Sequence, residues 1–348
     1  MTATPLLSDL TTRAKAQAHS RTTSCPCGTP ETLTDRPDAT VVRHADTVAK
    51  AHAPGTPLPA LAPRLTVAAH LPDLFLPPLS PTPTELHGRL VTFWPYGTPV
   101  DPDDPDAAPW EAAATLLARL HRTPAPAGSP PMRGPAKAAR AVTRLMAITT
   151  GVREPTAPQG AAVSSVPAPE TAALPAPTPT PTDPTPHSAV PPILQAWSVL
   201  PAWARGEAPM PGAATLCHGD LHLGQLVRHP APDGPWLLID VDDLGTGVPA
   251  WDLARPAAWY ACGLLPPEEW ARFLAAYRAA GGPAVPADGD PWPALDIPAR
   301  ALTVQTAARA VAKAITENRP LDEIEMSVID ACARMGSLPP ELTPTSAK

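Results

Sequence analysis

Two acids and an amide follow one another in the second half of the chain at spacings that suit phosphoryl transfer. Asp220 stands in a His-Gly-Asp loop, Gln225 follows it five residues later, and Asp240 ends an apolar run. An acid that faces an acceptor hydroxyl takes up its proton as the bond to phosphorus forms. Carboxylate and amide oxygens are the usual ligands of a hard cation such as Mg²⁺. These residues predict phosphoryl transfer from a nucleotide to a hydroxyl group.

The local sequence indicates how each group is presented. Gly219, directly before Asp220, allows a sharp turn that points the carboxylate out of the core and into a cleft. The apolar residues 236–239 predict a buried strand that ends at Asp240. Asp242 follows, where a second acid would bind magnesium or cap the loop.

This set of residues resembles the aminoglycoside phosphotransferase/choline kinase family, whose members are relatives of the protein kinases. In that family a His-Gly-Asp-x-x-x-x-Asn loop carries the catalytic acid and one metal ligand, and an Ile-Asp segment carries the other ligand. The resemblance implies that Asp220 is the catalytic acid, that Asp240 is the main magnesium ligand and that His218 packs and orients the loop. Gln225 stands where Asn is usual, and residues 218–225 are similar to the loop of bacterial maltokinases, in which Gln takes this role.

Two further segments carry the resemblance. Residues 247–254 resemble the family's Asp-Leu-Ala helix start, and residues 117–121 resemble its Leu-x-x-Leu-His helix end. The similarity extends loosely over residues 40–310 and is specific near residues 216–254. It implies an α+β, protein-kinase-like fold of two lobes, with a small β-rich N-lobe and a larger, mostly helical C-lobe.

Three residues of the N-terminal part are candidates for nucleotide binding. Lys50 ends a predicted strand and resembles the kinase lysine that contacts the nucleotide phosphates. Trp94 and Tyr96 lie where a kinase hinge would read adenine. The predicted helix over residues 57–70 contains no acid to pair with Lys50, and no glycine-rich loop precedes the lysine. These gaps keep open an alternative, a catalytically inactive kinase-like protein that binds a nucleotide or another small molecule.

The resemblance implies Mg²⁺ as the cofactor. The first expected binding partner is a nucleotide, ATP or GTP, which donates the phosphoryl group. The second partner is a small-molecule hydroxyl substrate: a sugar, an aminoglycoside or an amino alcohol. An acidic wall would suit the amines of an aminoglycoside, whereas a sugar would favour stacking on tryptophan. The sequence leaves both kinds of acceptor open, because the residues that could line the acceptor site include tryptophans as well as acids: Trp251, Trp259, Glu268 and Asp296.

Two other kinds of site fit the sequence less well. His218 and His222 are four residues apart, as two zinc ligands on one helix would be. Gly219 and the loop context work against a single helical face, and no third ligand has a suitable spacing. No Gly-x-Ser-x-Gly segment occurs, which argues against a serine hydrolase.

The composition limits the class of protein further. The chain has 348 residues, a formal net charge of −7 and no basic block, so we expect no nucleic-acid partner. No stretch approaches the roughly 20 apolar residues that span a bilayer. We therefore expect no membrane partner and a cytoplasmic location. The five scattered cysteines do not form a disulfide framework.

Composition shifts predict the organisation of the chain. We expect a disordered leader over residues 1–30, an N-lobe over 31–97, a helical C-lobe over 98–338 and a tail over 339–348. Residues 154–192 are rich in Pro, Ala and Thr, which predicts a disordered insertion within the C-lobe. Further helices are predicted over residues 134–150, 193–205, 267–280, 297–316 and 321–334.

Overall fold

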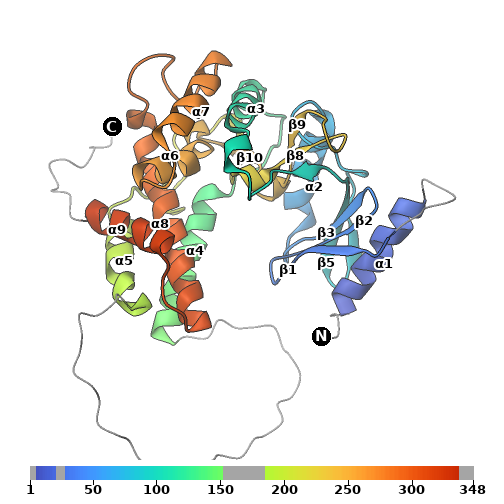
Figure 1. The fold of residues 1–348 in the computed structure, drawn as a ribbon, viewed down its shortest axis with the longest axis horizontal. Coiled ribbons are helices and arrows are strands. Elements are labelled where there is room, and N and C mark those ends of the chain that lie inside the picture. The colour runs from blue at the N-terminus through green and yellow to red at the C-terminus, as the bar shows by residue number, and fades with distance from the viewer. Residues whose placement is uncertain (1–4, 21–27, 152–184, 337–348) are drawn as a thin grey trace, which may run out of the picture. The chain divides into compact units, whose positions relative to one another are not determined.

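The computed structural model describes residues 5–20, 28–151 and 185–336 (Figure 1). The chain divides into two compact units. The first comprises Met1–Gly134 with Ala208–Ala299, and the second comprises Pro135–Glu207 with Arg300–Lys348. Within the described residues, all strands and all candidate site residues lie in the first unit.

A five-stranded antiparallel sheet forms the N-terminal part of the first unit, in the order β1-β2-β3-β5-β4. Side chains alternate between its two faces along each strand. On β3, Ala49 and Ala51 are buried in the core on one face, so Lys50 between them points to the other face. The strands are β1 (Glu31–Arg36), β2 (Ala39–His44), β3 (Thr47–Ala51), β4 (Thr84–Leu86) and β5 (Arg89–Pro95).

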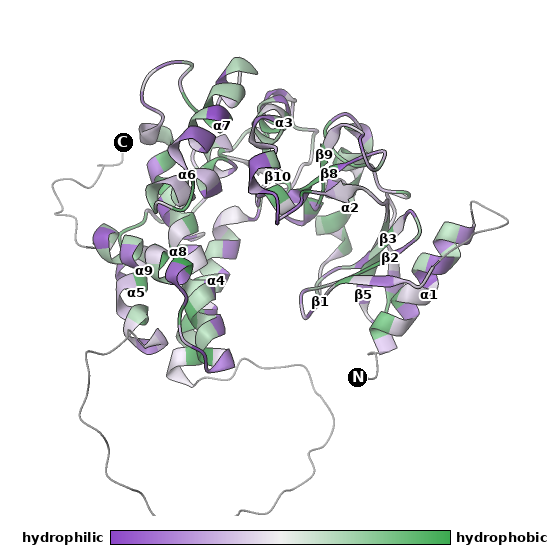
Figure 2. Ribbon diagram, viewed as in Figure 1, coloured by the Kyte–Doolittle hydropathy of each residue, from purple (hydrophilic) through white to green (hydrophobic). Residues whose placement is uncertain are grey.

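Helix α1 (Pro5–His19) packs against β2 and β3, and the prediction of a disordered leader is wrong for these residues (Figure 1). Leu10 and Ala14 are fully buried in the same cluster as Ala49. These two apolar residues are four apart, which places them on one helical face. The leader prediction relied on the polar character of the whole segment, and α1 does carry hydrophilic residues along its length (Figure 2).

Short strands position the candidate catalytic residues. The His-Gly-Asp loop follows β7, Gln225 directly precedes β8, and Asp240 follows β9 after one residue. The strands form two small antiparallel sheets, in the orders β6-β8-β9 and β10-β7. Their bounds are β6 (Thr98–Pro99), β7 (Thr215–Cys217), β8 (Leu226–Arg228), β9 (Trp236–Leu238) and β10 (Gly245–Gly247).

Helices complete the first unit around these strands. Helix α3 packs against α7 and β7, and α2 contacts the short helical turn η4. The helix predicted over residues 57–70 is confirmed as α2. The helices are α2 (Leu58–His70), α3 (Trp110–Arg122), α6 (Ala254–Ala261) and α7 (Pro267–Ala279), with the turns η1 (Pro105–Ala107), η3 (Leu223–Gln225), η4 (Val241–Asp243) and η5 (Pro249–Trp251).

Within the described residues of the second unit, the regular elements are all helices, joined by turns. Helix α5 packs against α9, and burial of Ile193 and Ala196 orders the chain here. The prediction of a disordered insertion over residues 154–192 is therefore wrong for its last residues, where η2 and α5 begin. The part of the insertion up to residue 184 and the predicted tail over 339–348 lie outside the described residues. The elements are η2 (Pro186–Ala189), α4 (Gly134–Thr150), α5 (Val190–Ser198), α8 (Trp292–Glu317) and α9 (Glu323–Gly336), with the division between units falling inside α8.

Among the described helices, none has the length and apolar character needed to cross a membrane.

The packing of α1 leads to a stability prediction. Leu10→Ala removes a fully buried side chain and is expected to lower the free energy of unfolding by about 2–5 kcal/mol. Leu33→Ala is the matched control, because Leu33 on β1 is 43% exposed and should change stability by only about 0.5 kcal/mol. Chemical denaturation followed by circular dichroism measures both; equal effects would contradict the packing role of α1.

Candidate active site

An ion-pair cluster joins the five-stranded sheet to the two candidate metal-binding acids. Lys50 Nζ lies 2.7 Å from Asp240 Oδ1 and 2.9 Å from Asp242 Oδ2. Burial alone would lower the pKa of Lys50, but the two carboxylates outweigh it and raise this pKa above its ordinary value. Burial would raise the pKa of Asp242, but Lys50 and His52 hold it well below its usual range. Lys50 and Asp242 are therefore both charged at neutral pH.

Asp240 adopts a backbone conformation that is uncommon for a residue with a side chain. Its φ of 62° and ψ of 82° lie in the left-handed region, which aspartate tolerates better than most residues. Its carboxylate accepts the N–H of Asp242 at 3.3 Å, which stabilises the turn. Such conformations cost energy and concentrate at functional sites.

The sequence prediction missed His52, which contacts the same cluster. Its Nδ1 lies 2.8 Å from Asp242 Oδ1, and its Nε2 lies 2.9 Å from Thr92 Oγ1. Trp94 Nε1 donates to the same hydroxyl at 2.9 Å. Trp94, predicted to contact adenine, is thus a buried residue whose indole N–H is used inside the protein. The signal for His52 was its place two residues after Lys50, on the same side of an extended strand.

Tyr96, the second residue predicted to lie at the adenine, is also engaged within the first unit. Its backbone N–H donates to Asp46 O at 2.7 Å, and its carbonyl lies 3.0 Å from His229 Nδ1. The guanidinium of Arg43 covers its ring at 3.3 Å from the centroid. The backbone N–H of Tyr96 therefore has a partner already, and an adenine contact by this residue stays a prediction.

Gln225 meets both Asp240 and His222. His222 Nδ1 accepts the N–H of Gly224 at 3.1 Å, so a neutral imidazole carries its hydrogen on Nε2. The amide nitrogen of Gln225 lies 3.1 Å from this Nε2 and donates to Asp240 Oδ2 at 3.4 Å. The side chains of Gln225 and Asp240 therefore lie together, as predicted for two ligands of one cation. The oxygen of the Gln225 amide belongs to the same group and is the atom that would bind the cation.

Helix α2 provides an arginine where a protein kinase would provide a glutamate. Buried Arg64 donates from Nε to Leu244 O at 2.7 Å and from Nη2 to Pro131 O at 3.1 Å. The helix thereby holds the backbone just beyond the acids instead of pairing with Lys50. The acidic partners of Lys50, absent from residues 57–70, are Asp240 and Asp242, which follow β9.

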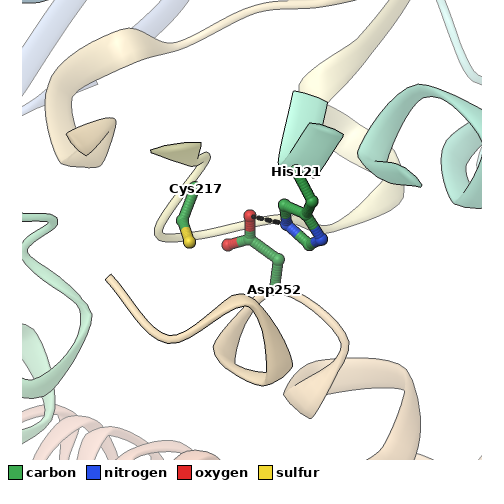
Figure 3. Close-up of side chains that lie close together, drawn as sticks. All are labelled: His121, Cys217 and Asp252. Atoms are coloured by element: carbon green, nitrogen blue, oxygen red, sulfur yellow. Dashed lines mark hydrogen bonds and ion pairs between the residues drawn. The ribbon is translucent and has the colours of Figure 1, made fainter. Parts of the chain in front are cut away.

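A buried carboxylate fixes the start of the His-Gly-Asp loop. Asp252 accepts the N–H of His218 at 2.6 Å on Oδ2 and the N–H of Gly219 at 2.7 Å on Oδ1. His121 Nε2 lies 3.0 Å from Oδ2 (Figure 3). The Nδ1 of His121 lies 2.7 Å from the hydroxyl of Tyr277. Each polar group in this network has a partner, which is the condition for burying it without a large penalty. The segments 117–121 and 247–254 thus meet at the loop they support.

His121, Cys217 and Asp252 are also the group of potential metal ligands found close together among the described residues. Burial raises the pKa of the Cys217 thiol well above its ordinary value, so the thiolate that binds metals is disfavoured. Both oxygens of Asp252 already accept N–H groups. We therefore assign this group (Figure 3) to support of the loop and not to metal binding.

His218 points away from the loop's acidic residue and into the core. Its Nε2 lies 2.9 Å from Ile239 O, in the residue before Asp240, and its ring stacks on Phe75 with an interplanar angle of 10°. The side chain is buried. These contacts link the His-Gly-Asp loop to the end of β9 and are those of a packing residue.

Asp220 forms an ion pair that the sequence did not indicate. Arg255 Nη2 donates to Asp220 Oδ1 at 2.7 Å, and its Nε donates to Leu221 O at 3.2 Å. Both side chains are largely buried, at 14% exposure for Asp220 and 15% for Arg255. Arg255 therefore fixes the acid and the backbone that follows it.

A recess adjoins this ion pair, and one of the residues predicted for an acceptor wall lies in it. Trp259 lines the recess, whereas Trp251 is buried in the core. Glu268 lies in the exposed first turn of α7, and Asp296 lies within α8. The other residues that line the recess are Trp110, Ala113, Leu221, His222, Leu223, Arg255 and Pro256.

The sheet lysine, the supported His-Gly-Asp loop and the facing acids define a protein-kinase-like phosphotransferase. Residues 38–295 match the sequence profile of the phosphotransferase enzyme family, APH. The match covers more than half of the chain, so the chain belongs to this family, as its motifs predicted. It is a phosphotransferase with an alcohol group as acceptor.

Solved structures confirm the protein-kinase-like fold. A thermostable mutant of aminoglycoside phosphotransferase APH(4)-Ia, in a ternary complex with AMP-PNP and hygromycin B, has a TM-score of 0.53 and 12% identity over 94% of this chain and 99% of that chain. Spectinomycin phosphotransferase APH(9)-Ia, in complex with ADP and spectinomycin, has a TM-score of 0.51 and 11% identity over 90% of each chain. No curated protein sequence matches the chain significantly.

The geometry of Gly219 leads to a second prediction. Its φ of +87° disfavours any side chain, and a Cβ there would collide with the carbonyl oxygen of Asp243. Gly212→Ala is the matched control, because Gly212 has a φ of +62° but open space around it. The control should cost about 1–2 kcal/mol of stability for the backbone conformation alone. Gly219→Ala should cost about 1–3 kcal/mol more because of the collision.

Urea denaturation of both glycine variants measures this difference. Equal losses for Gly219→Ala and Gly212→Ala would contradict the close approach of the His-Gly-Asp loop to Asp243.

Proposed function

We propose that the protein transfers the γ-phosphoryl group of ATP or GTP to a hydroxyl group of a small molecule in the cytoplasm, with magnesium as cofactor. The observation that carries this proposal is the meeting of Lys50 with Asp240 and Asp242. These groups come from distant parts of the chain, and a cluster of one ammonium and two carboxylates at a strained turn fits a phosphate-binding site better than a structural one.

The donor set around Asp240 suits magnesium. The carboxylates of Asp240 and Asp242 and the amide oxygen of Gln225 are hard oxygen ligands. Lys50 balances one of the two negative charges of Asp240 and Asp242, and the remaining negative charge supports the binding of a further cation here. Magnesium bound there supplies charge neutralisation at the phosphate oxygens of the nucleotide.

The residues of the chain then have distinct tasks. Lys50 turns from the acids to the nucleotide phosphates and holds them by charge. Asp220 orients the acceptor hydroxyl through a hydrogen bond and takes its proton as the oxygen–phosphorus bond forms. His218 keeps the loop of Asp220 packed against the strand end that carries Asp240. Trp94 and Tyr96 mark the region where we place the adenine.

The proposal is tested by ADP release with a panel of sugars, aminoglycosides and amino alcohols in the presence of MgATP. Asp220→Asn is expected to reduce turnover by a factor on the order of 100 or more, because proton acceptance and orientation are both lost. Asp233→Asn is the matched control, since Asp233 is exposed between β8 and β9 and should leave the rate unchanged.

Two results of this assay would contradict the proposal. Unchanged turnover in Asp220→Asn would remove this acid from the mechanism. Nucleotide binding without turnover of any member of the panel would favour the inactive, ligand-binding alternative.

A further inference from the structure

Resting on the proposed function, we infer that Arg255 makes the acceptor site selective for hydroxyl compounds without positive charge, uncharged sugars in particular, and against aminoglycosides and amino alcohols. The acceptor hydroxyl must approach the Asp220 carboxylate, and Arg255 lies beside that carboxylate. The selectivity depends on the Asp220–Arg255 ion pair and on the recess beside it.

The first observation is that the charge of the proposed catalytic acid is already balanced. Arg255 Nη2 lies 2.7 Å from Asp220 Oδ1, and Arg255 is held in place by its second bond to Leu221 O. A guanidinium keeps its charge at all relevant pH values. An ammonium group on the acceptor would therefore meet a neutralised carboxylate and a fixed cation, which repels it.

The second observation is the composition of the recess. Arg255 and Trp259 are four residues apart on α6 and so lie on one helical face, and both line the recess. Trp110 forms a further aromatic wall, and its indole N–H donates to Glu269 Oε2 at 2.6 Å. Arg255 is the one residue with a permanent charge among those that line this recess. The recess itself has a volume of about 10 Å³, which is room for one water molecule, so an acceptor would lie over its mouth and not inside it. Arg255 and Trp259 are half-buried and present a cation and an indole there.

The nearby acids do not reverse this argument. Glu269 is the acid in contact with a wall residue, and its carboxylate is directed to the indole of Trp110. Asp240 and Asp242 face Lys50. Glu268, predicted as part of an acidic wall, does not line the recess.

The test uses three probes that share a sugar ring and differ in charge: glucose, glucosamine and glucuronate. Binding is followed by intrinsic tryptophan fluorescence, because Trp110 and Trp259 line the recess, and turnover is followed by ADP release with KM and kcat separated. Wild-type protein should bind glucosamine about tenfold more weakly than glucose, and glucuronate at least as well as glucose.

Variants of Arg255 separate charge from position. Arg255→Gln should reduce the glucose-to-glucosamine preference to within about threefold and lower kcat for every acceptor, since Asp220 loses its anchor. Arg255→Lys should keep the preference because it keeps the charge. Arg272→Gln is the control: Arg272 is exposed on α7 and its loss should leave the preference unchanged.

Three outcomes would overturn the inference: tighter or equal binding of glucosamine by the wild type, an unchanged preference in a folded Arg255→Gln variant, or no binding of any of the three probes. The order of the probes on the wild type decides the matter even if Arg255→Gln fails to fold. Thermal shift with MgATP on the same samples tests the proposed function separately. A MgATP shift with the wrong order of probes would overturn this inference alone.

Discussion

The ion pairs of Lys50 with Asp240 and Asp242 are the interaction on which the rest of the site depends. They join β3 to a loop 190 residues further along the chain. A buried charge without partners is strongly destabilising, so these three side chains must be placed together. Helix α1 fixes β3 from its opposite face, and Arg64 of α2 fixes the backbone beyond the two acids.

Around this cluster the protein uses buried polar groups whose partners are supplied by distant segments. Asp252 accepts both N–H groups at the start of the His-Gly-Asp loop, and His121 connects it to Tyr277. The loop acid is in turn held by Arg255. The His-Gly-Asp loop is therefore preorganised, whereas Lys50 must turn from the two acids to reach the nucleotide phosphates. Glycine is required at position 219 because φ is positive there and the carbonyl oxygen of Asp243 lies where a Cβ would be.

The sequence was sufficient to predict the fold class and the residues of the motifs. The order of the His-Gly-Asp loop, the Ile-Asp segment and the Asp-Leu-Ala helix start pointed to the family and to a kinase-like fold. The predicted roles of Asp220, Gln225 and Asp240 remain part of the proposal, although Gln225 and Asp240 do lie together. Arg255 sits directly after that helix start, but nothing in its local sequence indicated a bond to Asp220.

What the sequence did not indicate depends on contacts between distant segments. His52 and Arg64 act on a loop more than a hundred residues away. The place of His52 two residues after Lys50 indicated its side of the sheet, but short-range patterns do not identify its partner Asp242 or the partners of Arg64. Helix α1 was missed because its few apolar residues form a core only together with β2 and β3. Trp94 was assigned to the adenine because its segment falls where a kinase hinge would lie, whereas the burial of its indole depends on Thr92 and the surrounding sheet.

The most direct test of the account is the calorimetric affinity for ATP with magnesium and with a chelator, for the wild type and for Asp240→Asn. The account predicts that magnesium tightens ATP binding about tenfold or more in the wild type, and that Asp240→Asn abolishes this gain because the cation loses its main ligand. Equal affinity with and without magnesium in the wild type, or a gain that persists in Asp240→Asn, would contradict it.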